Sequence, residues 1–204
     1  MLDENNVKIP FSDLGIIALN SCKELGSKID AQLTCRRKQM FTDSDEHYYI
    51  DEAKDSYLID ITNPRFSNGE AKLTIQETVR GKDIYILADI GNYGCTYEMF
   101  GLETAMGPDE HFQDIKRAIS AIEGNARRVS VIMPLLYASR QHKRKGRESL
   151  DCAMALQELE RLGVENIITF DAHDPRVENA VPLRFENLYP TFSIIRTFLK
   201  TEEN

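Results

Sequence analysis

A concentration of cationic side chains in the middle of this acidic chain is the first feature that could do chemistry. Five of the eight residues from Arg140 to Arg147 are Lys or Arg, whereas the formal net charge of the chain is -8. Clustered cations raise the local electrostatic potential in a way that the net charge conceals. An anionic ligand is therefore the first candidate for this segment, which we call the basic loop.

The basic loop has three interpretations: a solvated surface loop, a nucleic-acid patch, or a phosphate site. The chain is acidic overall and places no aromatic platform beside the cations, which argues against nucleic acid. The chemistry of the loop alone leaves a solvated loop and a phosphate site equally open.

A second group of reactive side chains is Asp171-Ala172-His173, which follows an apolar segment. A lone histidine most often has a structural role. As a metal ligand, His173 would need partners, and Asp171, Asp174 and phosphate oxygens would complete an oxygen-rich magnesium shell. The chain contains no G-x-x-x-x-G-K-[ST] motif, so nucleotide phosphates would have to be held in another way.

Two apolar segments are expected to position these residues. Val129 to Met133, closed by Pro134, and Val164 to Phe170 are typical of buried parallel strands. Between them we predict a helix capped by Ser149 and ended by Gly163, with an apolar face of Leu150, Met154, Leu156, Leu159 and Leu162. Ligands of open α/β sheets bind beyond the carboxyl ends of the strands, where both reactive groups would lie.

The remaining elements follow from periodicity. Further strands are predicted at residues 14–19, 56–61, 70–75 and 83–88, and helices at 23–35, 107–124 and 190–199. The polar segment 36–55, which contains His47, is interpreted as an insertion or hairpin. The Gly-rich segment 89–107 is interpreted as a loop and a candidate wall of a binding site. Asn68-Gly69 is a strong turn signal, so local chemistry favours a simple hairpin tip there.

Bulk composition indicates an ordinary globular protein. The 204 residues are 42% hydrophobic and 28% charged, and the start of the chain lacks the features of a secretory signal. We therefore expect a soluble protein in the cytoplasm without a membrane span. The four cysteines show no C-x-x-C spacing, so we expect them to be reduced and structural, with neither a disulfide nor a zinc site.

Several spaced motifs resemble those of the ribose-phosphate pyrophosphokinases (phosphoribosyl diphosphate synthetases). In the order of that family, they are Phe66 to Glu70, Thr78 to Asp83, Tyr137 to Gln141 with its basic continuation, Thr169 to His173, and Asn187 to Tyr189. The similarity covers most of Leu14 to Lys200. Several motifs in order are much more specific than any one of them, and they revise the interpretation of Asn68-Gly69 as a simple hairpin tip.

The resemblance implies roles for individual residues. Phe66, Asn68 and Glu70 would form an adenine pocket that reaches a neighbouring subunit's nucleotide, with Phe66 stacked on the base. Arg140 and Gln141 would bind ATP, and Asp171 and His173 would form the magnesium corner. Thr78 and Arg80 would match a regulatory phosphate or nucleotide site.

The resemblance also implies a fold: a mainly parallel sheet flanked by helices in a three-layer α/β/α arrangement, similar to the type I phosphoribosyltransferase domain. Residues 1–186 would form an amino-terminal ATP-binding domain. Residues 187–204 would be a terminal helix that begins a second domain, missing or truncated here.

The activity implied is the conversion of ATP and ribose 5-phosphate to AMP and 5-phosphoribosyl 1-diphosphate by a homo-oligomer with magnesium. Nucleic acid and membrane are not expected as partners. The chain departs from the family by carrying His142 where an acid is usual, and by lacking the family's ribose-phosphate loop. We therefore expect an incomplete and inactive half-enzyme, or alternatively a non-catalytic regulatory or oligomerising homologue.

Overall fold

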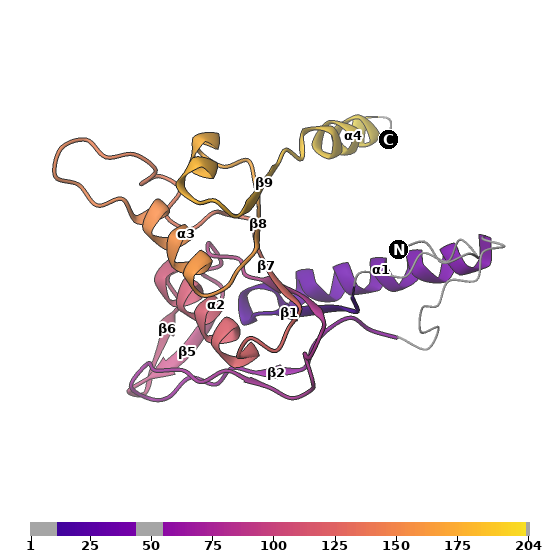
Figure 1. The fold of residues 1–204 in the computed structure, drawn as a ribbon, viewed down its shortest axis with the longest axis horizontal. Helices are drawn as coiled ribbons and strands as arrows, with labels where there is room; N and C mark the ends of the chain where they lie inside the picture. Colours follow the sequence, from indigo (N-terminus) through magenta and orange to yellow (C-terminus); the bar gives the residue numbers. More distant parts are fainter. Residues whose placement is uncertain (1–11, 44–54, 203–204) are drawn as a thin grey trace.

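The computed structural model describes residues 12–43 and 55–202, and a five-stranded sheet lies at its centre (Figure 1). The strand order is β1-β4-β7-β8-β9, and every neighbouring pair is parallel. The strands are β1 (Leu14–Ala18), β4 (Asp83–Leu87), β7 (Arg128–Met133), β8 (Asn166–Phe170) and β9 (Arg184–Leu188). The expected α/β class with a mainly parallel sheet is confirmed.

Helices cover the two faces of this sheet, so the three-layer arrangement is also confirmed. One face packs against α2 (Pro108–Ile122) and α3 (Asp151–Arg161), whose buried side chains share a core with Ile17, Ile86 and Val131. The other face carries α1 (Lys23–Asp43), where Ile29 and Leu33 pack near Ile16. These four strand residues are 3% exposed or less, because strands of a parallel sheet that is covered by helices are buried on both faces.

Helix α2 follows its sequence signals closely. Pro108 occupies the first turn, where its missing N–H leaves no hydrogen bond unmade, and the Glu110 carboxylate accepts a 2.7 Å hydrogen bond from the Gly107 backbone N–H. Its predicted apolar face is confirmed as buried: Phe112, Ile115, Ala118, Ile119 and Ile122. Helix α2 therefore holds the side chains of its first turn at a defined place beside the carboxyl ends of the strands.

The predicted apolar face of α3 was partly wrong. Met154 is 58% exposed and Leu162 is 42% exposed, whereas the buried positions are Cys152, Ala155, Leu156 and Leu159. Helical spacing of three and four residues selects this narrower stripe for the sheet. The helix begins at Asp151 with Leu150 as its N-cap, so the predicted cap at Ser149 was wrong as well.

Two short antiparallel sheets lie outside the central sheet. Where the sequence predicted full strands at 56–61 and 70–75, only β2 (Ile61–Thr62) and β3 (Thr74–Ile75) pair with each other, and Leu58 makes one bridge to Ile16. The segment 89–107, expected as a loop, instead contains a hairpin of β5 (Thr96–Met99) and β6 (Leu102–Ala105).

The ends of other predicted elements also shift. Helix α1 continues through Asp43, so residues 36–43 are helical rather than an insertion, and His47 lies outside the described residues. After His173 the structure adds the short 3-10 helix η2 (Pro175–Ala180) and strand β9, neither of which was predicted. A second short 3-10 helix, η1 (Asn20–Cys22), joins β1 to α1.

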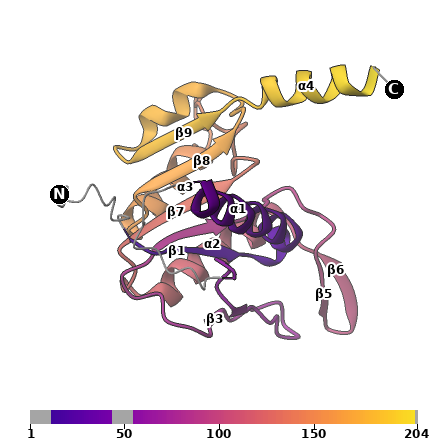
Figure 2. The same ribbon diagram turned by 90° about the vertical axis from the view of Figure 1, so that its right-hand side faces the viewer.

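Helix α4 (Thr191–Glu202) extends away from the body of the molecule (Figure 2). Its apolar residues are at least half exposed: Phe192, Ile194, Ile195, Phe198 and Leu199. Because β9 runs through Leu188, Asn187 and Leu188 belong to the sheet. The division of the chain near residue 186 stays a prediction.

Among the described helices, none combines the length and the apolar content that crossing a bilayer requires.

The cysteines are free thiols in the structure. Burial raises the pKa of both Cys22 and Cys152 to about 11, with the Asp89 carboxylate as a further cause at Cys22. Both thiols are therefore protonated at neutral pH and pack as small apolar side chains, in line with the structural role expected for them.

Candidate functional site

The carboxyl ends of β7 and β8 bring together the two reactive groups found in the sequence. Met133 of β7 pairs with Thr169 of β8, so the segments that follow these strands leave the same edge of the sheet. Arg140 and Gln141 follow β7, and Asp171 and His173 follow β8. The parallel sheet thus positions both groups at one edge, as the predicted strand–loop–helix–strand unit requires.

Within this edge, His142 connects the basic loop to the segment after β8. Its Nε2 lies 3.1 Å from Oδ2 of Asp174, and its ring meets the His173 ring edge-on at a centroid distance of 5.4 Å. The Nδ1 atom of His142 lies 3.1 Å from the Ser139 carbonyl oxygen, which can only accept a hydrogen bond. His142 therefore holds the start of the basic loop close to the Asp171–Asp174 segment.

Asp174 is a fixed anion at this junction. The guanidinium and backbone N–H of Arg176 both donate hydrogen bonds to the Asp174 carboxylate, and these bonds hold its pKa well below the usual range for a carboxyl group. Because Arg176 and His142 already engage both oxygens, Asp174 is a poor metal ligand. The sequence-based suggestion that Asp174 completes a magnesium shell is therefore not supported.

The backbone of Asp171 has a left-handed conformation, with φ of 47°. Its N–H donates to the Leu188 carbonyl at 2.9 Å, and the next N–H, of Ala172, donates to Oδ1 of Asn187 at 2.9 Å. The end of β9 thus stabilises a conformation that a non-glycine residue rarely adopts. The side chains of Asp171 and His173 are left exposed at the strand ends.

The basic loop presents its cations to solvent. The five basic side chains are all exposed: Arg140, Lys143, Arg144, Lys145 and Arg147. Within the part of the chain that the structure describes, none of them forms an ion pair. Their charge is therefore not neutralised by the folded chain and is available to an anion.

The motif Phe66 to Glu70 forms the tip of a hairpin closed by the antiparallel bridge between Arg65 and Ala71. We call residues 65–71 the finger hairpin. Gly69 has φ of 87°, as the Asn68-Gly69 turn signal predicted, and the Asn68 side chain bonds both the backbone N–H and the carboxylate of Glu70. Phe66 is 49% exposed at the tip, so its ring is free to contact a ligand or another chain.

A buried ion network fixes the base of the finger hairpin to α2. Arg65 lies 2.7 Å from Asp114, Arg117 lies 2.6 Å from the other Asp114 oxygen, and the amide of Asn63 donates to Asp114 at 2.9 Å. The side chains of Arg65 and Asp114 are 7% and 2% exposed. Sequence analysis missed this network, because its partners are 49 residues apart in the chain.

The finger hairpin and the basic loop extend from different parts of the molecule. In Figure 1 the finger hairpin runs along the lower left, below β5 and β6, whereas the basic loop extends at the upper left. No hydrogen bond or ion pair joins the two segments among the described residues. Within one chain, the finger hairpin and the basic loop are therefore separate surfaces.

Thr78 and Arg80 lie at the opposite edge of the sheet from the basic loop. They form a turn just before β4, in which the Arg80 N–H donates to the Thr78 hydroxyl at 3.3 Å, and Gly81 bonds the backbone of Asn125 just before β7. Both side chains are exposed. The structure thus separates these residues from the other candidate site residues.

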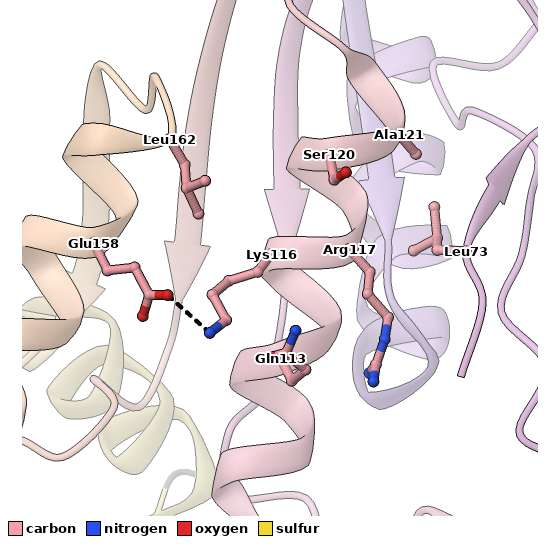
Figure 3. A pocket seen from close by; sticks show the side chains of 8 residues that line it. All are labelled: Leu73, Gln113, Lys116, Arg117, Ser120, Ala121, Glu158 and Leu162. Carbon is pink, nitrogen blue, oxygen red and sulfur yellow. Dashed lines mark hydrogen bonds and ion pairs between the residues drawn. The ribbon is translucent and has the colours of Figure 1, made fainter. Parts of the chain in front are cut away.

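A cleft of 480 Å³ lies between α2 and α3 (Figure 3). A neighbouring hollow of 610 Å³ shares Lys116 and Glu158 with it and extends toward Tyr137. Lys116 is paired with Glu158 at 2.9 Å, and Arg117 is paired with Asp114, so the cations of this cleft are already neutralised. The cleft contains none of the residues that the sequence motifs single out.

The donor set at the strand ends fits magnesium better than a metal held by protein alone. The described residues include no group of three or more His, Cys, Asp or Glu side chains that could hold a metal ion. Magnesium usually binds through one or two carboxylates, completed by water and substrate phosphates. The exposed carboxylate of Asp171 beside the basic loop suits that mode, with His173 next to it.

Comparison with known proteins gives the family. Residues 14–163 match the sequence profile of the N-terminal domain of ribose phosphate pyrophosphokinase. The chain belongs to this family. Its curated relatives include the ribose-phosphate pyrophosphokinase 1 of Schizosaccharomyces pombe, 32% identical over 132 residues that cover 64% of this chain and 29% of that protein. The ribose-phosphate pyrophosphokinase of Corynebacterium ammoniagenes is 25% identical over 179 residues, 87% of this chain and 45% of that protein.

A solved structure of the family supports the fold. The phosphoribosylpyrophosphate synthetase of Mycobacterium smegmatis superposes with a TM-score of 0.67 at 18% identity, covering 91% of this chain and 51% of that one. The chain thus spans about half the length of that structure and less than half of the two curated relatives. The roles of individual site residues are not given by these comparisons and stay predictions.

Proposed function

We propose that this chain is the nucleotide-binding half of a ribose-phosphate diphosphokinase, which converts ATP and ribose 5-phosphate to AMP and 5-phosphoribosyl 1-diphosphate. The observation that carries the proposal is that Arg140, Gln141, Asp171 and His173 all follow the carboxyl ends of the neighbouring strands β7 and β8. His142 and Asp174 are in contact between these two segments. The names of the curated relatives favour this catalytic assignment over a non-catalytic regulatory homologue.

Each group at the edge has a part in the proposed site. In this proposal Arg140 and Gln141 bind the ATP phosphates, and Asp171 and His173 would hold Mg²⁺. Transfer of the diphosphoryl group requires the sugar hydroxyl to attack the β-phosphorus while AMP leaves, and such reactions depend on positioning and charge neutralisation. Bound magnesium would neutralise phosphate charge, and the exposed cations of the basic loop would add to that effect.

The adenine end of the site comes from a second copy in this proposal. Phe66 stacks on the base, and Asn68 and Glu70 offer it a side-chain amide and a carboxylate. The exposed tip of the finger hairpin and its separation from the basic loop in Figure 1 support a site shared in a homo-oligomer.

Thr78 and Arg80, which lie at the amino end of strand β4, are proposed as a separate regulatory site for phosphate or nucleotide. The cytoplasm is the proposed location.

Calorimetric titration with ATP and magnesium tests nucleotide binding directly. We expect weak, saturable binding of ATP and ADP that requires magnesium, because the phosphate-binding and metal-binding groups lie at one edge. A folded chain that shows no heat of binding with either nucleotide would contradict the proposal.

The chain assayed alone is expected to produce no 5-phosphoribosyl 1-diphosphate from ATP, magnesium and ribose 5-phosphate. No residues for the sugar phosphate are recognisable in the sequence, so ATP would be bound without a positioned acceptor. A coupled assay of AMP formation measures this. Sustained turnover by the purified 204-residue chain would show that the sugar-phosphate site lies within it.

A further inference from the structure

The β5–β6 hairpin carries a charge arrangement that the folded chain does not explain. Glu98 and Glu103 are directly opposite each other in the antiparallel pair, so their side chains project from the same face, and both are exposed. Like charges at opposed positions destabilise a two-stranded sheet. Glu103 accepts a hydrogen bond from Thr96, but within the described ranges nothing bonds the Glu98 carboxylate. A cationic partner outside the chain would relieve this repulsion.

The tip of the same hairpin exposes large apolar side chains. Phe100 is 75% exposed and Leu102 is 71% exposed. The Phe100 N–H donates to the Ser67 carbonyl at 2.9 Å, so this tip lies beside the tip of the finger hairpin and its exposed Phe66. The tips of the two hairpins therefore expose Phe66 and Phe100 side by side, and Glu98 and Glu103 lie on the outward face of the β5–β6 hairpin next to this tip.

This surface is held in a fixed orientation by contacts on its inner side. The Tyr97 hydroxyl donates to Glu110 of α2 at 2.6 Å, and the Arg65 guanidinium lies over the Tyr97 ring at 5.4 Å. Gly69 packs so closely on β5 that a Cβ there would be 3.1 Å from the Met99 sulfur. The surface is preorganised, so a partner can bind it without an added cost of ordering the hairpin.

The complement to this surface is present on the same chain. The basic loop exposes Lys143, Arg144, Lys145 and Arg147, and none of them forms an ion pair among the residues described. In one chain the basic loop and the β5–β6 hairpin extend from different parts of the molecule (Figure 1). A two-fold contact between copies would pair each hairpin with the other copy's loop.

We infer that the outward face of the β5–β6 hairpin docks on the basic loop of a second copy of this chain. Glu98 and Glu103 meet the partner copy's cations from residues 143–147, while Phe100 at the turn is covered beside Phe66. The inference rests on the proposed shared nucleotide site and adds to it a surface formed by segment 89–107. The hairpin brings the finger hairpin and the partner copy's phosphate-binding residues into register.

Charge reversal on each side, followed by mixing, tests this contact. E98K/E103K gives a chain whose hairpin and loop are both basic, and K143E/R144E/K145E/R147E gives a chain in which both are acidic. We expect sedimentation velocity at about 50 mM salt to show self-association of either variant weakened by at least about tenfold. An equimolar mixture of the two is expected to associate as well as the parent chain, because every hairpin then has a loop of opposite charge.

The matched control is E165K/E178K, which makes the same change in net charge at two exposed glutamates remote from the hairpin. It is expected to associate like the parent chain. A parent chain that stays monomeric at about 100 μM would overturn the inference. Normal self-association of E98K/E103K would also overturn the inference, and so would a mixture of the two variants that does not recover the association of the parent chain. If in those cases the parent chain still binds Mg·ATP, the proposed nucleotide site stands and only the docking surface fails.

Discussion

Replacing Asp114 with alanine is expected to destabilise the fold by about 3–5 kcal/mol, because it leaves the Arg65 guanidinium buried without a counter-charge. Arg65 is 7% exposed, lies 2.7 Å from Asp114, and belongs to the base of the finger hairpin. Asp114 also receives hydrogen bonds from Asn63 and Arg117, which lose their acceptor in the same variant. Chemical denaturation followed by circular dichroism measures the change in the free energy of unfolding.

The ion pair between Glu24 and Lys28 provides the matched control. Its 2.6 Å separation equals that of Arg117 and Asp114, but its side chains are 84% and 70% exposed. Glu24→Ala is expected to leave the unfolding midpoint nearly unchanged, because water screens exposed pairs. Equal effects of Asp114→Ala and Glu24→Ala would show that the network does not anchor the finger hairpin to α2.

Replacing Arg140 with alanine is expected to weaken Mg·ATP binding by roughly 1.5–3 kcal/mol, which corresponds to about a 10- to 150-fold rise in Kd. Arg140 is exposed beside the carboxyl ends of β7 and β8, so its removal takes away a charge-assisted contact with phosphate and leaves the core intact. Isothermal titration calorimetry gives the two dissociation constants.

Arg161→Ala is the control for the loss of one exposed arginine. Arg161 lies in the last turn of α3 and lines the 610 Å³ hollow between α2 and α3, away from the carboxyl ends of β7 and β8. Its replacement is expected to leave Mg·ATP affinity unchanged. Identical dissociation constants for the parent chain and Arg140→Ala would remove Arg140 from the nucleotide site.

The central strands were predictable because burial on both faces demands continuous apolar runs. Val131 and Ile167 are 0% exposed in β7 and β8, and each lies inside a run that the sequence identifies. Strand β9 has no such run, because it forms the edge of the sheet and buries Phe185 only in part. An edge strand needs a polar side, so its pattern resembles that of a loop.

The β5–β6 hairpin left a weaker signal that was nonetheless present. Tyr97 and Met99 alternate with exposed neighbours, and Gly101 at the turn has φ of 80°. The strands have four residues each, which is short for a period-two pattern to be distinguished from a Gly-rich loop. The exposure of Met154 in α3 has a related cause, since sequence alone does not show which apolar stripe meets the sheet.

The sequence predicted those parts of the site that short motifs along the chain define. Residue order placed Arg140 and His173 after neighbouring strands, and the structure brings those segments to one edge. The contacts that organise the edge were beyond sequence analysis, because His142 and Asp174 are 32 residues apart, and their contact depends on how two irregular segments fold. The same holds for Arg65 and Asp114 beneath the finger hairpin.

The shared nucleotide site is tested most directly by mixing two defective variants and counting ATP sites by calorimetry. Phe66→Ala impairs the finger hairpin and Arg140→Ala impairs the basic loop, so a mixed pair of copies contains one doubly defective site and one intact site. In an equimolar, randomly exchanged mixture, about a quarter of the sites should regain the parent affinity. A mixture of Arg140→Ala with Gln141→Ala, both in the same loop, should regain none. Failure of the first mixture to recover any high-affinity sites, with a parent chain that binds Mg·ATP, would contradict a site built from two copies.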